Sequence, residues 1–267
     1  MIRRLPGRRS DGSRRGRLTR VLSVIGLIVA TFTLPGCEYS PLSTIPQDGT
    51  TNERIWDVYW FLWIGAAVVF VLVEGLLIYT IFRFRHAPQT AHGRPVPVHG
   101  NTKLEILWTI IPAIVLVFIA VPTLQIIAEL SDPPDREGEE SLKVIVTARQ
   151  FFFQFEYPEL GIQTSNTMYI PAGRVIDIDL RSGDVIHSFW VPRLAGKMDN
   201  VPGRTNEMWL EAKAPGTYAG ECAEFCGVGH ALMRFSVEAQ TPEDFDAWVQ
   251  EQLNPPTGGG GGGEGGD

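Results

Sequence analysis

Two long apolar segments constrain this chain more than any other feature of its sequence. The first extends from about Trp60 to Phe82 and the second from about Ile106 to Ala128. Each is close to the ~20 residues that an α-helix needs to cross the hydrocarbon core of a bilayer. Because one short loop separates them, we expect a hairpin of two transmembrane helices at about residues 60–82 and 106–128.

The loop between these segments indicates how the hairpin is oriented. It carries Arg83, Arg85, Arg94 and Lys103 and has no acidic residue between them. Short positively charged loops stay in the cytoplasm. We therefore expect everything after the second segment to lie on the external, periplasmic side of a bacterial cell membrane.

The first 36 residues have the pattern of an export signal. Eight arginines precede residue 21, and an apolar run from Val21 to Leu34 follows them. The signal ends in L-P-G-C, so Cys37 resembles the lipid-modified first residue of a bacterial lipoprotein. Because Pro35 is unusual there, ordinary cleavage and an uncleaved anchor remain alternatives. Residues 37–130 would then hold a short external segment and the two helices.

Residues 131–254 have the pattern of an external β domain. Three stretches alternate apolar and polar residues, with Gly or Pro between them: S-L-K-V-I-V-T-A, R-V-I-D-I-D-L-R and M-R-F-S-V-E-A. Such short strands are typical of a Greek-key sandwich or barrel.

A short helix should close this domain. Thr241 is a suitable capping residue, and Phe245, Trp248 and Leu253 follow at helical spacing. The Gly-rich residues 255–267 have almost no apolar side chain to bury, so we expect them to be disordered.

One loop concentrates soft metal ligands. The segment C-A-E-F-C-G-V-G-H-A-L-M contains Cys222, Cys226, His230 and Met233. Thiolate and thioether are soft ligands and imidazole suits copper, so this set favours copper over magnesium, calcium or manganese.

Two other interpretations of the loop remain open. A tetrahedral zinc site would leave Met233 unused, and a Cys222–Cys226 disulfide would suit an oxidising compartment without explaining His230. A covalent haem would need C-x-x-C-H, which the chain lacks.

A second imidazole must come from another segment if two metal ions share the two thiolates. Of the five histidines, His187 lies in the same half of the chain as the cysteines, within D-V-I-H-S-F-W-V-P. A lone histidine in such an apolar setting is usually a core residue. The cysteine loop favours a ligand instead.

Three stretches together resemble subunit II of the haem–copper cytochrome c oxidases, which carries a binuclear copper centre called CuA. They are residues 184–192, 197–206 and 215–233, and the resemblance covers roughly residues 50–252. It implies a transmembrane hairpin followed by an all-β cupredoxin-like Greek-key domain. The copper ligands it implies are His187, Cys222, Cys226, His230, Met233 and the backbone carbonyl of Glu224.

The resemblance also implies a function. Such a subunit accepts one electron at a time from cytochrome c at CuA and passes it to haem in subunit I, where oxygen reduction is coupled to proton translocation. Its partners would be subunit I, with haem and CuB, and subunit III. The alternatives are a CuA-bearing subunit of a membrane nitric oxide reductase and a copper-binding lipoprotein. A quinol oxidase subunit II would lack the copper ligands.

Three glutamates have roles to weigh. Glu224 resembles the residue whose side chain binds a magnesium or manganese ion at the contact with subunit I, although a plain exposed loop acid is the alternative. Glu105 matches the acid at the mouth of a proton channel, and an interfacial carboxylate is the alternative. Glu74 lies inside the first apolar segment, where an ionisable group is costly, and no role is assigned to it.

The donor-facing surface departs from the family pattern. In A-R-Q-F-F-F-Q-F-E-Y, Phe151 stands where the family commonly has the tryptophan that receives electrons. If this cluster is not simply core packing, Phe151 takes that role.

The external region is strongly acidic. From Ser131 onward the chain has 22 acidic and 10 basic residues. This excess makes a nucleic-acid partner unexpected. It steers basic partners to the surface or forms only a solvated face. Because cytochrome c often docks on acidic residues, the resemblance favours Asp184, near His187, as a docking residue.

Overall fold

The computed structural model describes residues 19, 22–27, 40–45, 47–85, 99–134 and 140–255. The chain divides into two units, residues 1–40 and 41–267. In the first, residues 22–27 are helical. The expected lipidation site Cys37 and the Gly-rich tail beyond Pro255 lie outside the described residues.

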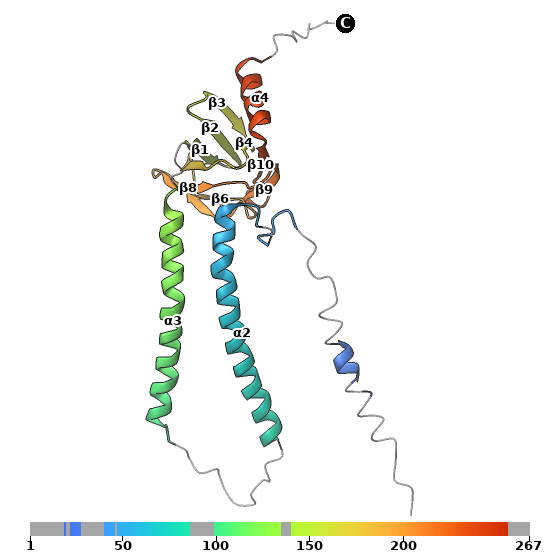
Figure 1. The fold of residues 1–267 in the computed structure, drawn as a ribbon, viewed down its shortest axis with the longest axis vertical. Coiled ribbons are helices and arrows are strands. Elements are labelled where there is room, and N and C mark those ends of the chain that lie inside the picture. Colours follow the sequence, from blue (N-terminus) through green and yellow to red (C-terminus); the bar gives the residue numbers. More distant parts are fainter. Residues whose placement is uncertain are drawn as a thin grey trace, which may run out of the picture. The chain divides into compact units, whose positions relative to one another are not determined.

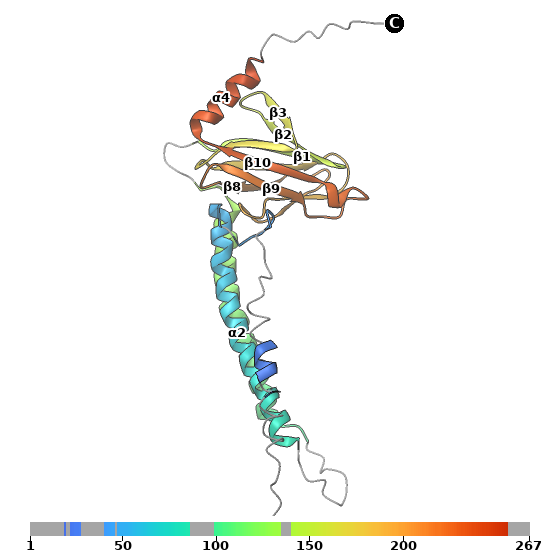
Figure 2. The ribbon, with the colours of Figure 1, turned by 90° about the vertical axis from the view of Figure 1, so that its right-hand side faces the viewer.

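The second unit contains both predicted long helices, α2 (Thr50–Phe84) and α3 (Thr102–Ser131). They run side by side (Figures 1 and 2), and both are long and apolar enough to cross a membrane. The Asn101 side chain caps α3 by accepting hydrogen bonds from the amides of Lys103 and Leu104. Both helices extend beyond the predicted apolar segments, most of all at the start of α2.

The first turn of α2 is attached to the β domain, which explains why the helix begins so early. Gly49 forms a β-bridge with Ala212, and its amide donates to the carbonyl of Arg193 at 3.2 Å. A Cβ at position 49 would collide with the backbone of Leu194, so this approach requires glycine. Asp48 adds an ion pair with Arg193 at 2.6 Å.

Two further ion pairs hold the outer ends of the helices. Glu53 of α2 pairs with Lys213 of the β domain at 2.6 Å. Arg54 of α2 makes two parallel hydrogen bonds to Glu129 of α3, at 2.9 and 2.6 Å. This forked geometry fixes direction as well as distance between the two helices, while the Glu53–Lys213 pair joins α2 to the β domain.

The β domain is a sandwich of two five-stranded sheets. The first has the order β3-β2-β1-β5-β8 and the second β4-β10-β9-β6-β7. The strands of the first sheet are β1 (Leu142–Arg149), β2 (Phe152–Tyr157), β3 (Ile162–Ser165), β5 (Ile176–Ser182) and β8 (Asn206–Leu210). Those of the second are β4 (Thr167–Pro171), β6 (His187–Trp190), β7 (Met198–Asn200), β9 (Gly216–Cys222) and β10 (Arg234–Gln240). The predicted hairpin and cupredoxin-like sandwich are thus confirmed.

An aromatic cluster joins the two sheets. Phe153 of the first sheet meets Phe235 and Phe189 of the second, with ring centroids 4.7 and 6.1 Å away, and Phe189 stacks on Phe235 at 4.8 Å. The burial of alternate β2 residues, Phe153, Phe155 and Tyr157, makes that part of the aromatic stretch core. Phe151 lies outside it, in the β1–β2 turn.

The predicted closing helix is α4 (Pro242–Leu253). Phe245 and Trp248 are buried as expected, and Trp248 stacks on Tyr169 of β4 with centroids 4.6 Å apart. Leu253 is exposed in the last turn of the helix, whereas Val249, one position after Trp248, is buried.

Replacing Thr241 by alanine should lower the free energy of unfolding by about 1 kcal/mol, the usual loss when a helix N-cap is removed. The Thr241 hydroxyl accepts a hydrogen bond from the amide of Asp244 at 3.2 Å, and alanine cannot replace it. Denaturant unfolding of the detergent-solubilised chain measures the loss. Thr205→Ala, at an exposed loop position, is the control and should change stability by less than about 0.5 kcal/mol. Equal losses of stability in both variants would contradict the assignment of Thr241 as the N-cap of α4.

Candidate metal centre

The predicted ligands of the loop come together because two neighbouring strands hold its ends. We call residues 222–233 the ligand loop. It leaves β9 at Cys222 and returns to β10 after Met233, and the Cys222 amide donates to the Met233 carbonyl at 3.0 Å. A short 3-10 helix, His230–Leu232, precedes the return. Since β6 pairs with β9, His187 at the start of β6 lies beside the loop.

Each thiol of the loop lies near a different imidazole. The Sγ of Cys222 is 3.8 Å from Nδ1 of His187, and the Sγ of Cys226 is 3.7 Å from Nδ1 of His230. The two sulfur atoms are 3.9 Å apart. The remaining predicted ligands are also adjacent: Met233 Sδ is 3.7 Å from Cys226 Sγ, and the Glu224 carbonyl oxygen is 3.2 Å from Cys222 Sγ. The structure therefore gathers all six predicted copper-ligating groups.

The cysteines are free thiols, so the disulfide alternative is not realised in this structure. A disulfide needs sulfur atoms about 2.05 Å apart, roughly half the observed separation. Cys222 and Cys226 are 5 and 4% exposed, and burial raises the pKa of Cys226 to about 11. A metal ion would have to displace the thiol protons, because the thiolate is the ligand.

The donor set fits a metal centre. Metal–sulfur bonds of about 2.3 Å and metal–nitrogen bonds of about 2.0 Å let one ion reach sulfur and nitrogen atoms up to roughly 4.3 Å apart. The observed sulfur–nitrogen distances of 3.7 and 3.8 Å lie within this limit. Two thiols, two imidazoles, a thioether and a carbonyl exceed what a tetrahedral zinc ion needs, and the thioether of Met233 favours copper.

Asp184 fixes the orientation of His187. Its Oδ1 lies 2.8 Å from Nε2 of this fully buried ring and also accepts a hydrogen bond from the Val185 amide, while Oδ2 accepts one from the Gln150 amide. Burial acts to raise the pKa of Asp184, but the hydrogen bonds from Gln150, His187 and Val185 outweigh it and lower the pKa. The resulting carboxylate favours a proton on Nε2 and leaves Nδ1 free to bind metal. Sequence reasoning missed this role; docking by Asp184 stays a prediction.

The ligand loop itself exposes apolar side chains. Phe225, Val228 and Leu232 are 76, 102 and 83% exposed. The Phe151 ring, 37% exposed, packs against the loop at Gly229, where an added Cβ would lie 2.6 Å from the ring. This surface is available to a partner beside the buried ligands.

The structure places the three glutamates singled out from the sequence in three different settings. The Glu224 side chain is exposed although its carbonyl faces Cys222. Glu105 lies in the first turn of α3, about 40 Å along the helix from Ser131 at 1.5 Å per residue. Glu74 lines an otherwise apolar groove between α2 and α3 together with Val115 and Phe118.

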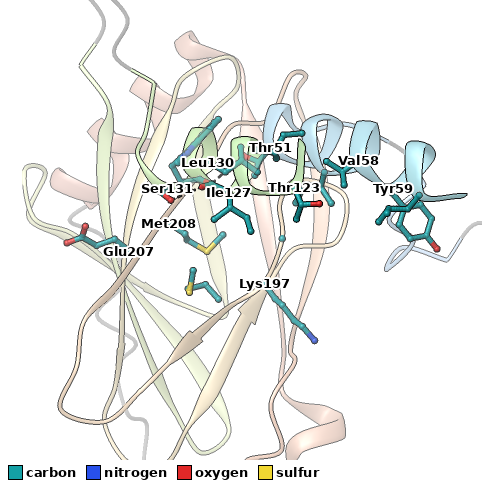
Figure 3. A pocket seen from close by; sticks show the side chains of 16 residues that line it. Thr51, Val58, Tyr59, Thr123, Ile127, Leu130, Ser131, Lys197, Glu207 and Met208 are labelled. Carbon is teal, nitrogen blue, oxygen red and sulfur yellow. Dashed lines mark hydrogen bonds between the residues drawn. The ribbon is translucent and has the colours of Figure 1, made fainter. Parts of the chain in front are cut away.

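A cavity of about 580 Å³ lies away from the ligand loop, between the outer ends of α2 and α3 and the β domain (Figure 3). Apolar residues such as Ile127 and Met208 line it, with Lys197 and Glu207 as its charged members. No sequence motif indicated this cavity.

Comparisons with known proteins agree with this arrangement. The family "Cytochrome C oxidase subunit II, transmembrane domain" matches residues 46–126, and "Cytochrome C oxidase subunit II, periplasmic domain" matches residues 160–240. Cytochrome c oxidase subunit 2 of Bacillus subtilis is 33% identical over 249 residues, which cover 89% of this chain and 68% of the relative. The chain belongs to the cytochrome c oxidase subunit II family. It is therefore a membrane protein, and its family implies a copper centre.

Other relatives of this subunit II chain carry two different names. Cytochrome c oxidase subunit 2 of Alkalihalophilus pseudofirmus is 41% identical over 224 residues, covering 82% of this chain and 65% of the relative. Quinol oxidase subunit 2 of Bacillus cereus is 32% identical over 233 residues, which cover 87% of this chain and 79% of the relative. The chain thus spans about two thirds of the length of the two cytochrome c oxidase relatives.

A solved structure is also similar to the β domain. It is the crystal structure of the periplasmic domain of subunit II of cytochrome oxidase of Bradyrhizobium japonicum, 28% identical, with a TM-score of 0.42. The alignment covers 45% of this chain and 96% of that one.

Proposed function

We propose that this chain is the subunit through which electrons enter a cytochrome c oxidase, and that its ligand loop and His187 hold a binuclear CuA centre. The cluster of two free thiols, each near its own imidazole, carries this proposal. The two thiolates would hold copper so that one charge is shared between two ions, and electron transfer would then need little reorganisation of the site.

The chain's own residues would bind and shield the metal. Cys222, Cys226, His187, His230 and Met233 would bind copper through their side chains, and Glu224 through its carbonyl. The buried thiols and His187 exclude water on the domain side of the site. Asp184, through its hydrogen bond to Nε2 of His187, would orient this ligand and tune the reduction potential of the bound copper.

The apolar surface around the loop supports a docking role. A cytochrome c or similar donor would dock over Phe151, with the acidic excess of the domain guiding its approach. The electron would leave for haem in subunit I, where oxygen is reduced and protons are translocated, within an assembly that also contains subunit III. Glu224 would bind a magnesium or manganese ion at the subunit I contact, and Glu105 would stand at the mouth of a proton channel.

The position in the cell follows from the same proposal. The two helices would cross a bacterial cell membrane, with residues 131–254 on the periplasmic side. The export signal, residues 1–36, would be cleaved, with Cys37 as the lipid-modified first residue, or would stay as an uncleaved anchor. Some relatives are named quinol oxidase subunit 2. If this chain were the subunit II of a quinol oxidase, its cluster of soft ligands would bind no copper and would have no role.

Copper reconstitution of the purified full-length chain tests the proposal. We expect two copper ions per chain and a spectrum in which one unpaired electron is shared by two copper nuclei. The spectrum should vanish on reduction and return on oxidation. A chain that binds a single zinc ion and stays colourless with copper would refute it.

A further inference from the structure

We propose that Gln150 is a positioning residue that ties the ligand loop to the strand carrying His187, so that both thiols and both imidazoles keep their places as the metal is bound. The inference rests on the proposed copper centre. Gln150 is not one of the predicted ligands; it lies in the turn between β1 and β2.

Gln150 reaches both ligand-bearing segments. Its side-chain Nε2 donates to the carbonyl oxygen of Cys226 at 2.6 Å, and its backbone amide donates to Oδ2 of Asp184 at 2.7 Å. The other carboxylate oxygen of Asp184 lies 2.8 Å from Nε2 of His187. An unbroken chain of hydrogen bonds thus connects Cys226 to His187 through one glutamine and one aspartate.

Close packing supports the same contact. Gly227, directly after Cys226, has φ +131°, and a Cβ there would lie 2.9 Å from Nε2 of Gln150. A Cβ added at Gly229 would likewise lie 2.6 Å from the ring of the neighbouring Phe151. The loop therefore rests on the 150–151 turn with no room for a side chain between them.

Other parts of the loop face solvent. The side chains of Phe225, Val228 and Leu232 are exposed. The turn supports the loop from the domain side, so the position of Cys226 depends on contacts such as the Gln150 hydrogen bond.

The chemistry requires a hydrogen-bond donor at position 150, which the side-chain amide of Gln150 supplies. A carbonyl oxygen only accepts hydrogen bonds, so the partner of Cys226 must donate. A glutamate of the same shape would place an acceptor against this carbonyl. Leucine would fill the space without any donor. Partners that position a metal ligand are typically worth about 10–100-fold in affinity.

The test uses the full-length chain in detergent with Gln150→Leu and Gln150→Glu. After copper loading, we expect a chelator to remove copper about 10–100-fold faster from both variants, with a shifted copper spectrum and a shifted reduction potential. Gln163→Glu, at an exposed position on β3, is the control for the change in charge and should behave as the parent chain.

A second measurement needs no metal. The amides of His230 and Leu232 donate to the carbonyls of Gly227 and Gly229. Their hydrogen exchange should be at least about tenfold faster in Gln150→Leu, because losing one hydrogen bond frees the loop. If the parent chain bound no copper pair, the proposed function would fail while this measurement would still report on the tether. Unchanged exchange together with unchanged copper release in Gln150→Leu would overturn the inference, as would an effect confined to Gln150→Glu.

Discussion

Replacing Cys226 by serine should abolish the proposed binuclear centre and lower the proposed oxidase turnover with cytochrome c by more than about 100-fold. Even residues that only position a metal ligand are typically worth about 10–100-fold in metal affinity or activity. Cys226 contacts three other ligand side chains: its sulfur lies within 3.9 Å of Cys222 Sγ, His230 Nδ1 and Met233 Sδ. Serine retains the shape of the side chain but replaces a soft thiolate by a hydroxyl, which copper binds poorly. Metal content, the copper spectrum and turnover of the assembled complex measure the change.

Met233→Leu is the matched comparison. Met233 is likewise buried, and its Sδ lies 3.7 Å from Cys226 Sγ. Leucine retains most of the volume and removes only the thioether. We expect both copper ions to stay bound while the spectrum and reduction potential shift. If the serine variant kept two copper ions with an unaltered spectrum, the ligand assignment would be wrong.

Replacing Phe189 by alanine should lower the free energy of unfolding by about 3–5 kcal/mol, the range for a large aromatic side chain lost from a core. The residue is fully buried, and its ring contacts Phe153 across the sandwich and stacks on Phe235 of its own sheet. The cavity would open between the two sheets, beside the strand that presents His187. Because Phe189 pairs with Cys222 in the sheet, we also expect weaker copper retention.

Denaturant unfolding of the detergent-solubilised chain checks the size of this effect. Phe225→Ala removes the same atoms from an exposed ring and should change stability by less than about 0.5 kcal/mol. Comparable losses in the two variants would show that the interior of the sandwich does not depend on Phe189.

Periodic patterns explain why much of the fold could be predicted from the sequence. Apolar runs of membrane length predicted α2 and α3, and alternation predicted β1, β5 and β10, because burial on one face imposes a period of two on a strand. The cluster of candidate metal ligands could be predicted for a different reason. Four soft ligands lie in one loop, and a loop held at both ends by paired strands has few ways to keep them apart.

Contacts between distant segments account for what sequence reasoning missed. The roles of Gln150 and Asp184 depend on three segments that meet only in the folded sandwich, and neither residue belongs to a metal-binding pattern. The early start of α2 depends on Gly49 reaching Ala212, far along the chain. In α4, Val249 is buried and Leu253 is exposed, because the core ends before the last turn of the helix.

The attachment of α2 to the sandwich has a mechanical consequence. The chain enters the domain from α3 through residues 132–141, and the bridge at Gly49 with the Asp48–Arg193 pair supplies a second anchor. Two anchors remove the swivelling freedom that a single linker would allow. Electron tunnelling weakens exponentially with distance, so a domain that cannot swivel would hold its redox centre at one height above the membrane and keep the tunnelling rate constant between turnovers.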